Sequence, residues 1–170
     1  MNIDGFEIER KYLIAMPSRE FLEGCQASSI TQTYLLVEKD ATERVRKRVY
    51  ADSCEYTHTV KHKLNNMRRL EEEREIDADE YAALLTRSDP QRRAIEKTRH
   101  CFRFDGRLWE LDVFSFWTDR AFLEIELTDE GEAVTLPPGL RLIREVTDDP
   151  RYTNAALSFE IPEEDIDGKG

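Results

Sequence analysis

The sequence has few cysteines and histidines, and those present form no disulfide or metal-binding pattern. Cys25, Cys54 and Cys101 are odd in number and have no paired spacing, which favours reduced thiols in a cytoplasmic protein over a disulfide framework. His58 and His62 lie four residues apart, but in a strand-like segment, where this spacing is not the helical zinc signature. We therefore expect neither disulfide bonds nor a zinc site.

The sequence also has no hydrophobic segment that could enter a membrane. No apolar run approaches the ~20 residues that a transmembrane helix needs, and the first residues lack the basic and apolar regions of a signal peptide. Positive charge is in deficit, because 36 acidic residues outnumber 25 lysines and arginines and give a net charge of −11. We therefore expect neither nucleic acid nor a membrane as a partner, although a local basic pocket is compatible with this balance.

The length and the charge content suggest a single domain with an unusual charged face. The chain has 170 residues, and 36% of them are charged, compared with about 25% in an average protein. We expect one domain over residues 1–160, followed by an acidic, solvated tail over 161–170. No dimer surface is evident from the sequence, and a homodimer is left open.

Alternating polar and apolar residues predict that most segments are strands. The predicted strands are 7–14, 29–37, 42–50, 55–63, 70–76, 91–104, 108–114 and 121–128. Short helices are predicted at 18–24, 79–86, 129–135 and 153–158, and a short strand or helix end at 141–146. The fold class is therefore mainly β (α+β). Eight antiparallel strands are enough to close a barrel or tunnel with a few short flanking helices.

The charges on these strands are grouped by sign. Period two places Glu7, Glu9 and Lys11 on one face of the first strand. The other sets are Arg44, Arg46 and Arg48; Lys61 and Lys63; Glu71, Glu73 and Glu75; Lys97 and Arg99; Glu110 and Asp112; and Glu124 and Glu126. Any one set could be an ordinary wet face, but clusters of like charge cost energy unless a partner offsets them. A barrel with this interior would be a wet tunnel that holds ions.

The two kinds of charge suggest the ligand. Arginine presents a fork of donors that matches phosphate oxygens. Carboxylates in this number suit a hard divalent cation such as Mg²⁺. Both sets together predict a metal-chelated polyphosphate, because a small organic anion would not need so many groups of either sign.

The first predicted strand begins with the string Glu7-Ile8-Glu9-Arg10-Lys11. This string matches the ExExK signature of the CYTH superfamily of triphosphate tunnel metalloenzymes, and the sequence as a whole resembles that family. The other matching segments include Gln32-Thr33-Tyr34-Leu35, Arg44-Val45-Arg46, Thr59-Val60-Lys61, Glu96-Lys97-Thr98-Arg99, Glu110-Leu111-Asp112-Val113-Phe114 and Glu124-Ile125-Glu126-Leu127. The resemblance implies an eight-stranded β-tunnel that hydrolyses a triphosphate, above all inorganic triphosphate, with one or two Mg²⁺ or Mn²⁺ ions.

The resemblance also implies roles for individual residues. The implied metal ligands are Glu7, Glu9, Glu71, Glu73, Asp112, Glu124 and Glu126. The implied phosphate-binding residues are Lys11, Arg44, Arg46, Arg48, Lys61, Lys63, Lys97 and Arg99. The implied catalytic residues are Lys61, Lys97 and Tyr34. Tyr34 would help to orient the attacking water, or it is simply a strand aromatic that packs on its neighbours.

Other functions use the same residues differently. A class IV adenylate cyclase or a thiamine triphosphatase would occupy the same tunnel, although no adenine pocket is evident from the sequence. A non-catalytic polyphosphate- or nucleotide-binding module would need only the basic half of the charges. A purely structural β domain would not respond to Mg²⁺ plus triphosphate. We expect a small-molecule triphosphate as the partner.

Overall fold

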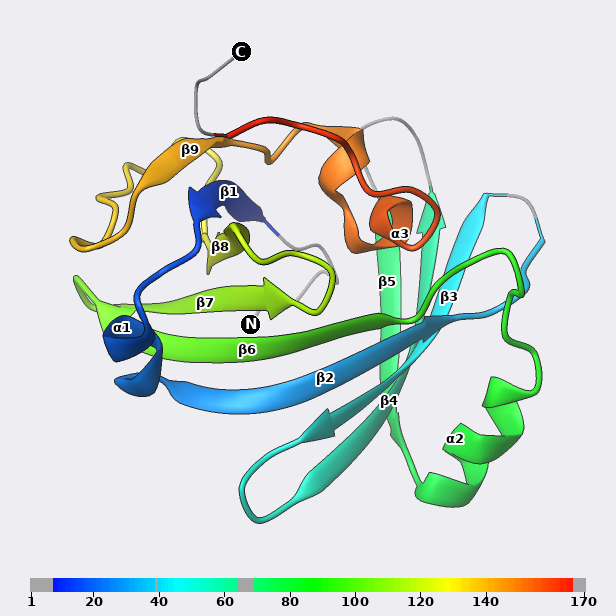
Figure 1. Ribbon diagram of the computed structural model, residues 1–170. Helices are drawn as coiled ribbons and strands as arrows, with labels where there is room; N and C mark the ends of the chain where they lie inside the picture. Colours follow the sequence, from blue (N-terminus) through cyan, green and yellow to red (C-terminus); the bar gives the residue numbers. More distant parts are fainter. Residues whose placement is uncertain (1–7, 39, 64–68, 167–170) are drawn as a thin grey trace.

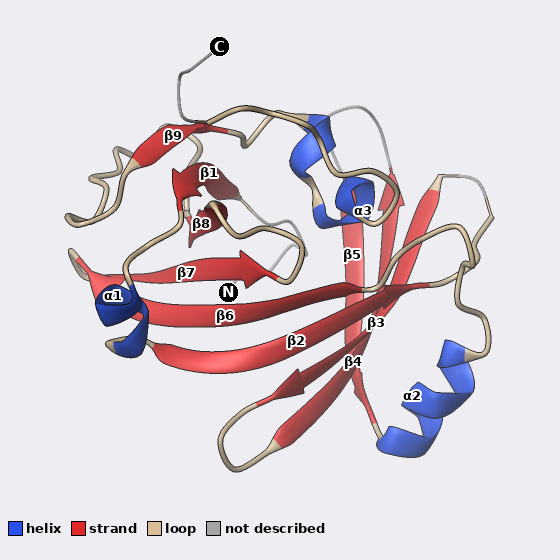
Figure 2. Cartoon of the chain, in the orientation of Figure 1, coloured by secondary structure: helices blue, strands red, loops and turns tan. Residues whose placement is uncertain are grey.

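Nine strands form one strongly curled antiparallel sheet in the computed structural model, which describes residues 8–38, 40–63 and 69–166 (Figure 1). The strands are β1 (Glu9–Ala15), β2 (Gln26–Tyr34), β3 (Ala41–Val49), β4 (Cys54–Lys63), β5 (Arg69–Ile76), β6 (Ile95–Phe104), β7 (Arg107–Phe114), β8 (Arg120–Glu126) and β9 (Leu142–Glu145). Their order in the sheet is β5-β4-β3-β2-β6-β7-β8-β1-β9. The sheet thus curls around a concave face (Figure 2).

The predicted mainly β, antiparallel, tunnel-like fold is confirmed, but the sheet is not a closed eight-stranded barrel. It has nine strands, and β5 and β9 form its two edges without a ladder between them in the described part of the chain. The ninth strand pairs with β1 through Tyr12 and Glu145 and is only four residues long. This short, irregular pairing lacks the long alternation by which the other strands were predicted. The tunnel is therefore a curled, open sheet.

Short helices cover the ends of the sheet and begin at residues with capping side chains. The helices are α1 (Arg19–Glu23), α2 (Ala78–Leu85), the 3₁₀ helix η1 (Pro150–Tyr152) and α3 (Asn154–Leu157). Ser18, Asp77 and Thr153 each accept a hydrogen bond from a backbone N–H of the first helical turn, as N-cap residues do. The helix predicted at 129–135 is wrong, because these residues form turns and irregular loop.

The two faces of the sheet have separate apolar cores. On the convex face, Trp109, Leu111 and Leu123 are almost completely buried with their neighbours. At one end of the concave face, Phe114 and Phe122 pack against the C-terminal segment in a second cluster. Side chains alternate along a strand, so the charged residues opposite the convex-face core point to the concave face. The concave face therefore has an apolar cluster at one end and the charged chamber at the other.

The acidic C-terminal segment was expected to be a solvated tail, and this is wrong for residues up to 166. Ile166 is 8% exposed and belongs to the concave-face core. Glu164 accepts hydrogen bonds from the Tyr152 hydroxyl at 2.8 Å and from Arg144 at 2.9 Å. The prediction of a solvated tail used only the negative charge of the segment, which does not reveal that some of its acidic groups have partners in the fold.

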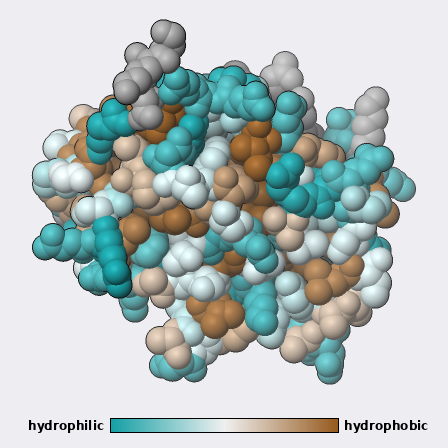
Figure 3. Space-filling model, in the orientation of Figure 1, coloured by the Kyte–Doolittle hydropathy of each residue, from teal (hydrophilic) through white to brown (hydrophobic). Residues whose placement is uncertain are grey.

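The hairpin and the outer surface agree with the sequence. Asp105 and Gly106 both have positive φ, at 53° and 72°, between β6 and β7, as a tight two-residue turn between antiparallel strands requires. On the face shown in Figure 3, hydrophobic residues lie in separate spots among hydrophilic ones. The longest described helix has eight residues, and none of the described helices meets the length and hydropathy of a membrane span.

Candidate active site

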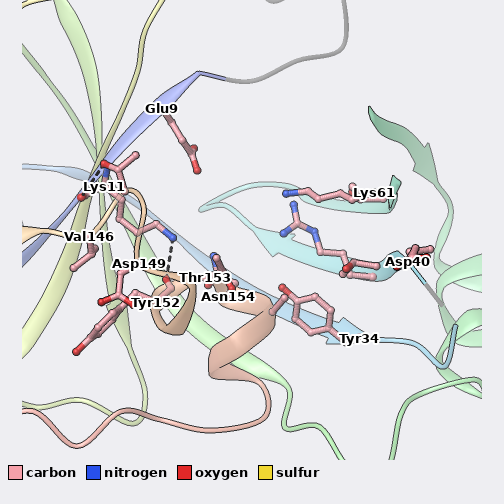
Figure 4. A pocket seen from close by; sticks show the side chains of 16 residues that line it. Glu9, Lys11, Tyr34, Asp40, Lys61, Val146, Asp149, Tyr152, Thr153 and Asn154 are labelled. Atoms are coloured by element: carbon pink, nitrogen blue, oxygen red, sulfur yellow. Dashed lines mark hydrogen bonds between the residues drawn. The ribbon is translucent and has the colours of Figure 1, made fainter. Parts of the chain in front are cut away.

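Two neighbouring cavities occupy the charged part of the concave face. The larger has a volume of about 400 Å³ and the smaller about 130 Å³. They share four lining residues, Glu9, Arg44, Lys61 and Asn154. Figure 4 shows Glu9 entering the larger cavity from β1, opposite Lys61, which enters from β4. The cavities thus form one chamber that strands from both halves of the sheet enclose.

Three cations on one wall of the chamber form no ion pair with any residue that the structure describes. Arg44 and Arg46 project from β3 and Lys61 from β4, and all three line the smaller cavity. Within the residues that the structure describes, none of these three side chains has an ion pair, and Arg44 Nε is buried without a hydrogen bond. Burial lowers the pKa of Arg46, and the neighbouring Arg44 lowers it further. This wall therefore favours an anionic ligand, which would offset the repulsion.

The cations on β6 are held by a buried aspartate. Lys97 Nζ lies 2.8 Å from Asp112, and Arg99 makes two hydrogen bonds of 2.9 Å to the same carboxylate. Burial opposes the charge of Asp112, but Lys97 and Arg99 together keep its pKa well below the usual range. Both oxygens are engaged, so Asp112 holds these two cations in place here. Its predicted role as a metal ligand has no support in this geometry.

Burial weakens the hold of Lys97 on its proton. It lowers the pKa of Lys97 to about 8, although the Asp112 charge acts in the opposite direction. Burial would also lower the pKa of Arg99, but the Asp112 charge raises it above the ordinary range. The lysine is therefore the group in this cluster whose charge changes near neutral pH.

Carboxylates line the opposite wall. Glu9 on β1 lies directly opposite Glu126 on β8, and Glu110 on β7 lies opposite Glu124. All four border the smaller cavity. Glu124 pairs with Lys11 at 3.3 Å, and Glu110 pairs with Arg99 at 2.7 Å. Like charges on directly opposed residues are unfavourable without a cation.

This donor set fits a hard divalent cation. The carboxylates supply only oxygen, as Mg²⁺ and Mn²⁺ prefer. In the described part of the chain, no three acidic, histidine or cysteine side chains are already gathered at coordination distance. A metal ion would therefore take part of its shell from water or from a phosphate ligand, which is usual for Mg²⁺.

Several predicted site residues lie elsewhere or outside the described residues. Arg48 Nε donates to Ser28 at 2.9 Å, and its guanidinium lies over the Tyr50 ring, so this arginine borders neither cavity. Glu73 accepts a hydrogen bond from Thr59 at 2.9 Å, and neither it nor Glu71 lines a cavity. Two further predicted site residues cannot be placed: Glu7 lies outside the described residues, and the side chain of Lys63 is not described.

Tyr34 lies where the chamber meets the concave-face core. Tyr34 is 3% exposed and belongs to the concave-face core. Its ring contacts the guanidinium of Arg92 at 4.1 Å, and it also lines the larger cavity below Lys61 (Figure 4). Another lining residue of the larger cavity, Lys11, donates a hydrogen bond to the backbone carbonyl of Tyr152 at 3.2 Å. Tyr34 is thus both a core residue and a wall of the chamber.

Three polar residues of the smaller cavity were not assigned to the site from the sequence. They are Gln32 on β2, Glu110 on β7 and Asn154 at the start of α3. Glu110 belongs to the same alternating face as Asp112, so its position could have been predicted. Asn154 accepts a weak hydrogen bond from Lys97 at 3.5 Å. That contact depends on how the C-terminal segment folds over the sheet, which local pattern does not reveal.

Comparison with known proteins decides the family. No family model matches the chain. An inorganic triphosphatase of Nitrosomonas europaea is 35% identical over 159 residues, which cover 92% of this chain and 99% of that protein. An inorganic triphosphatase of Acetivibrio thermocellus is also 35% identical, over 90% of this chain and 93% of that protein. This chain belongs to the CYTH superfamily.

A solved structure agrees with this assignment. The crystal structure of an inorganic triphosphatase is 32% identical to this chain, with a TM-score of 0.62 over 93% of this chain and 97% of that one. The similarity therefore spans the whole curled sheet and both walls of the chamber. The ordered charged strands are the features by which this CYTH protein was recognisable from sequence.

Proposed function

We propose that this CYTH protein hydrolyses inorganic triphosphate to pyrophosphate and phosphate with the help of a divalent cation. The observation that carries the proposal is the group of Arg44, Arg46 and Lys61, three cations that form no ion pair among the described residues and face a wall of carboxylates across one chamber. The likeness to inorganic triphosphatases supports the same substrate. Mg²⁺ or Mn²⁺ is the proposed metal, because the available donors are oxygens.

The residues of the chamber suit phosphoanhydride cleavage. Water attacks the terminal phosphorus, the bond from that phosphorus to the bridging oxygen breaks, and pyrophosphate leaves. Arg44, Arg46 and Lys61 would stabilise the negative charge on the phosphoryl oxygens and on the leaving group. Glu9, Glu124 and Glu126 would hold the metal ion, which when bound neutralises phosphate charge and lowers the pKa of a coordinated water. A carboxylate of the same wall would accept the proton of the attacking water.

A substrate panel tests the proposal. Purified protein is given inorganic triphosphate, thiamine triphosphate, ATP and long-chain polyphosphate, each with Mg²⁺, Mn²⁺ or EDTA. We expect phosphate release from inorganic triphosphate to exceed that from the other compounds, and to stop in EDTA because the carboxylates then hold no cation. Formation of cyclic AMP and pyrophosphate from ATP would instead identify a cyclase. Binding of triphosphate without turnover under every metal condition would contradict an enzymatic role.

Matched carboxylate variants locate the metal within the panel. Glu126→Gln removes a charge from the chamber, whereas Glu72→Gln removes one from the other face of β5, where Glu72 contacts His62 at 3.5 Å. Only the first variant should require a higher Mg²⁺ concentration for half-maximal rate. An equal Mg²⁺ requirement in the two variants would argue against a metal at this wall.

The rate of triphosphate hydrolysis is expected to depend on pH. Because the pKa of Lys97 is lowered to about 8, the lysine loses its charge as pH rises through this value. We expect kcat/KM for triphosphate to fall above about pH 8, by up to tenfold for each further pH unit. Lys97→Arg keeps the positive charge and should move this alkaline limb to higher pH. A pH–rate profile of both proteins makes the comparison, and an unchanged limb in Lys97→Arg would exclude Lys97 as its source.

A further inference from the structure

Gln32 is a buried amide without a hydrogen-bond partner. It lies near the C-terminal end of β2, is 1% exposed and lines the smaller cavity. Neither its Oε1 nor its Nε2 has a hydrogen-bond partner in the described structure. Leaving such a group unsatisfied in the protein interior is unfavourable. The amide is thus expected to have a partner when the protein is at work.

The neighbours of Gln32 restrict what this partner can be. Gln32 stands directly opposite Arg46 on β3 and Ile95 on β6. An arginine can only donate, so it can satisfy Oε1 but not the amide N–H groups. Ile95 offers no polar side-chain atom. No acceptor of the described residues lies within hydrogen-bond distance of Nε2, and two carboxylates of the same cavity, Glu110 and Glu124, pair instead with Arg99 and Lys11. An acceptor for Nε2 therefore has to come from a ligand or from water.

We propose that Gln32 contacts the substrate directly, donating from Nε2 to a non-bridging phosphoryl oxygen that Arg46 also binds. This inference rests on the proposed function, because the ligand is the triphosphate. An uncharged donor suits this position, since a further cation beside Arg44 and Arg46 would increase their mutual repulsion. Gln32 is then a substrate-binding residue of β2, beside the cations of β3, β4 and β6.

Gln32→Met tests the contact with little change in shape. Methionine has nearly the length and volume of glutamine but no amide, and Gln26→Met is the matched control at the exposed start of the same strand. Calorimetric titration with tripolyphosphate, in EDTA and again with Mg²⁺, gives the dissociation constant of each protein. We expect Gln32→Met to bind about 10- to 100-fold more weakly than the wild type, as for a lost hydrogen bond to a charged group. Gln26→Met should bind like the wild type.

Thermal unfolding without ligand separates binding from structure. Because the amide has no partner in the protein, the melting temperature of Gln32→Met should equal or exceed that of the wild type. Wild-type affinity in Gln32→Met would overturn the inference and indicate that water satisfies the amide. A lower melting temperature with unchanged ligand stabilisation would overturn it in favour of a structural role.

A second variant keeps the inference testable if Gln32→Met fails to fold. Gln32→Glu preserves the size and the acceptor and loses the donor, and its carboxylate can pair with Arg46. It should fold and bind tripolyphosphate more weakly than the wild type, and equal affinity would overturn the contact. The two proposals can fail independently. If the wild type binds triphosphate through Gln32 but hydrolyses none of it, the proposed function is wrong and the Gln32 contact stands.

Discussion

Replacing Arg46 with alanine is expected to reduce triphosphate hydrolysis by about 10²- to 10³-fold. Arg46 faces the smaller cavity and has no acidic partner among the described residues. Its charge is therefore available to phosphoryl oxygens, whereas Lys97 and Arg99 in the same cavity are engaged in ion pairs. The stability of the ligand-free protein should not fall, because the substitution removes a cation that burial and the charge of Arg44 disfavour more than the charge of Glu73 favours it.

Arg48→Ala is the matched control for this prediction. Arg48 lies two residues further along the same strand, but it bonds Ser28 and covers the Tyr50 ring. Its loss should leave kcat/KM within about a factor of three of the wild type. Steady-state kinetics with inorganic triphosphate and Mg²⁺ give both values. Equal losses in the two variants would contradict the distinction that the structure makes between these arginines.

The second large effect concerns stability. Asp112→Asn should lower the free energy of unfolding by about 3–5 kcal/mol, because it leaves the buried Lys97 without its ion pair and leaves Arg99 with Glu110 as its one paired carboxylate among the described residues. For a chain of this size, the melting temperature should fall by roughly 6–20 °C. Glu23→Gln breaks the exposed pair with Arg19 on α1 and should change stability by less than about 1 kcal/mol.

The effect of Asp112→Asn should depend on pH in a defined direction. The pKa of Asp112 is depressed in the folded protein, so its carboxylate contributes stability that is fully present above the unfolded pKa of about 4. That contribution is lost as pH falls from there through the lower folded value. Thermal melts of the wild type and the variant should therefore differ most near neutral pH and converge in acid. A constant difference down to pH 3 would show that Asp112 acts through packing and not through charge.

The strands and the hairpin were predictable because their signals are local. Alternation along 108–114 and 121–128 marked one buried face and one charged face, and β7 and β8 have that arrangement. The open edge of the sheet was not predictable, because it is formed by β9, which is four residues long and pairs with β1 through a register shift. The C-terminal segment was misread for a related reason. Its acidic groups indicated a solvated tail, whereas Glu164 and Ile166 contact the rest of the protein.

The sequence by itself determined the chemistry of the chamber. Period two along each strand is a property of the local chain, so it placed basic and acidic residues on one face and predicted a metal-chelated polyphosphate as the ligand. Only the tertiary structure decided which charges are available. Register and burial join Lys97 and Arg99 to Asp112, turn Arg48 towards Ser28, and leave Arg46 facing the cavity beside Gln32. Those outcomes depend on distances between strands far apart in the chain, which no local pattern encodes.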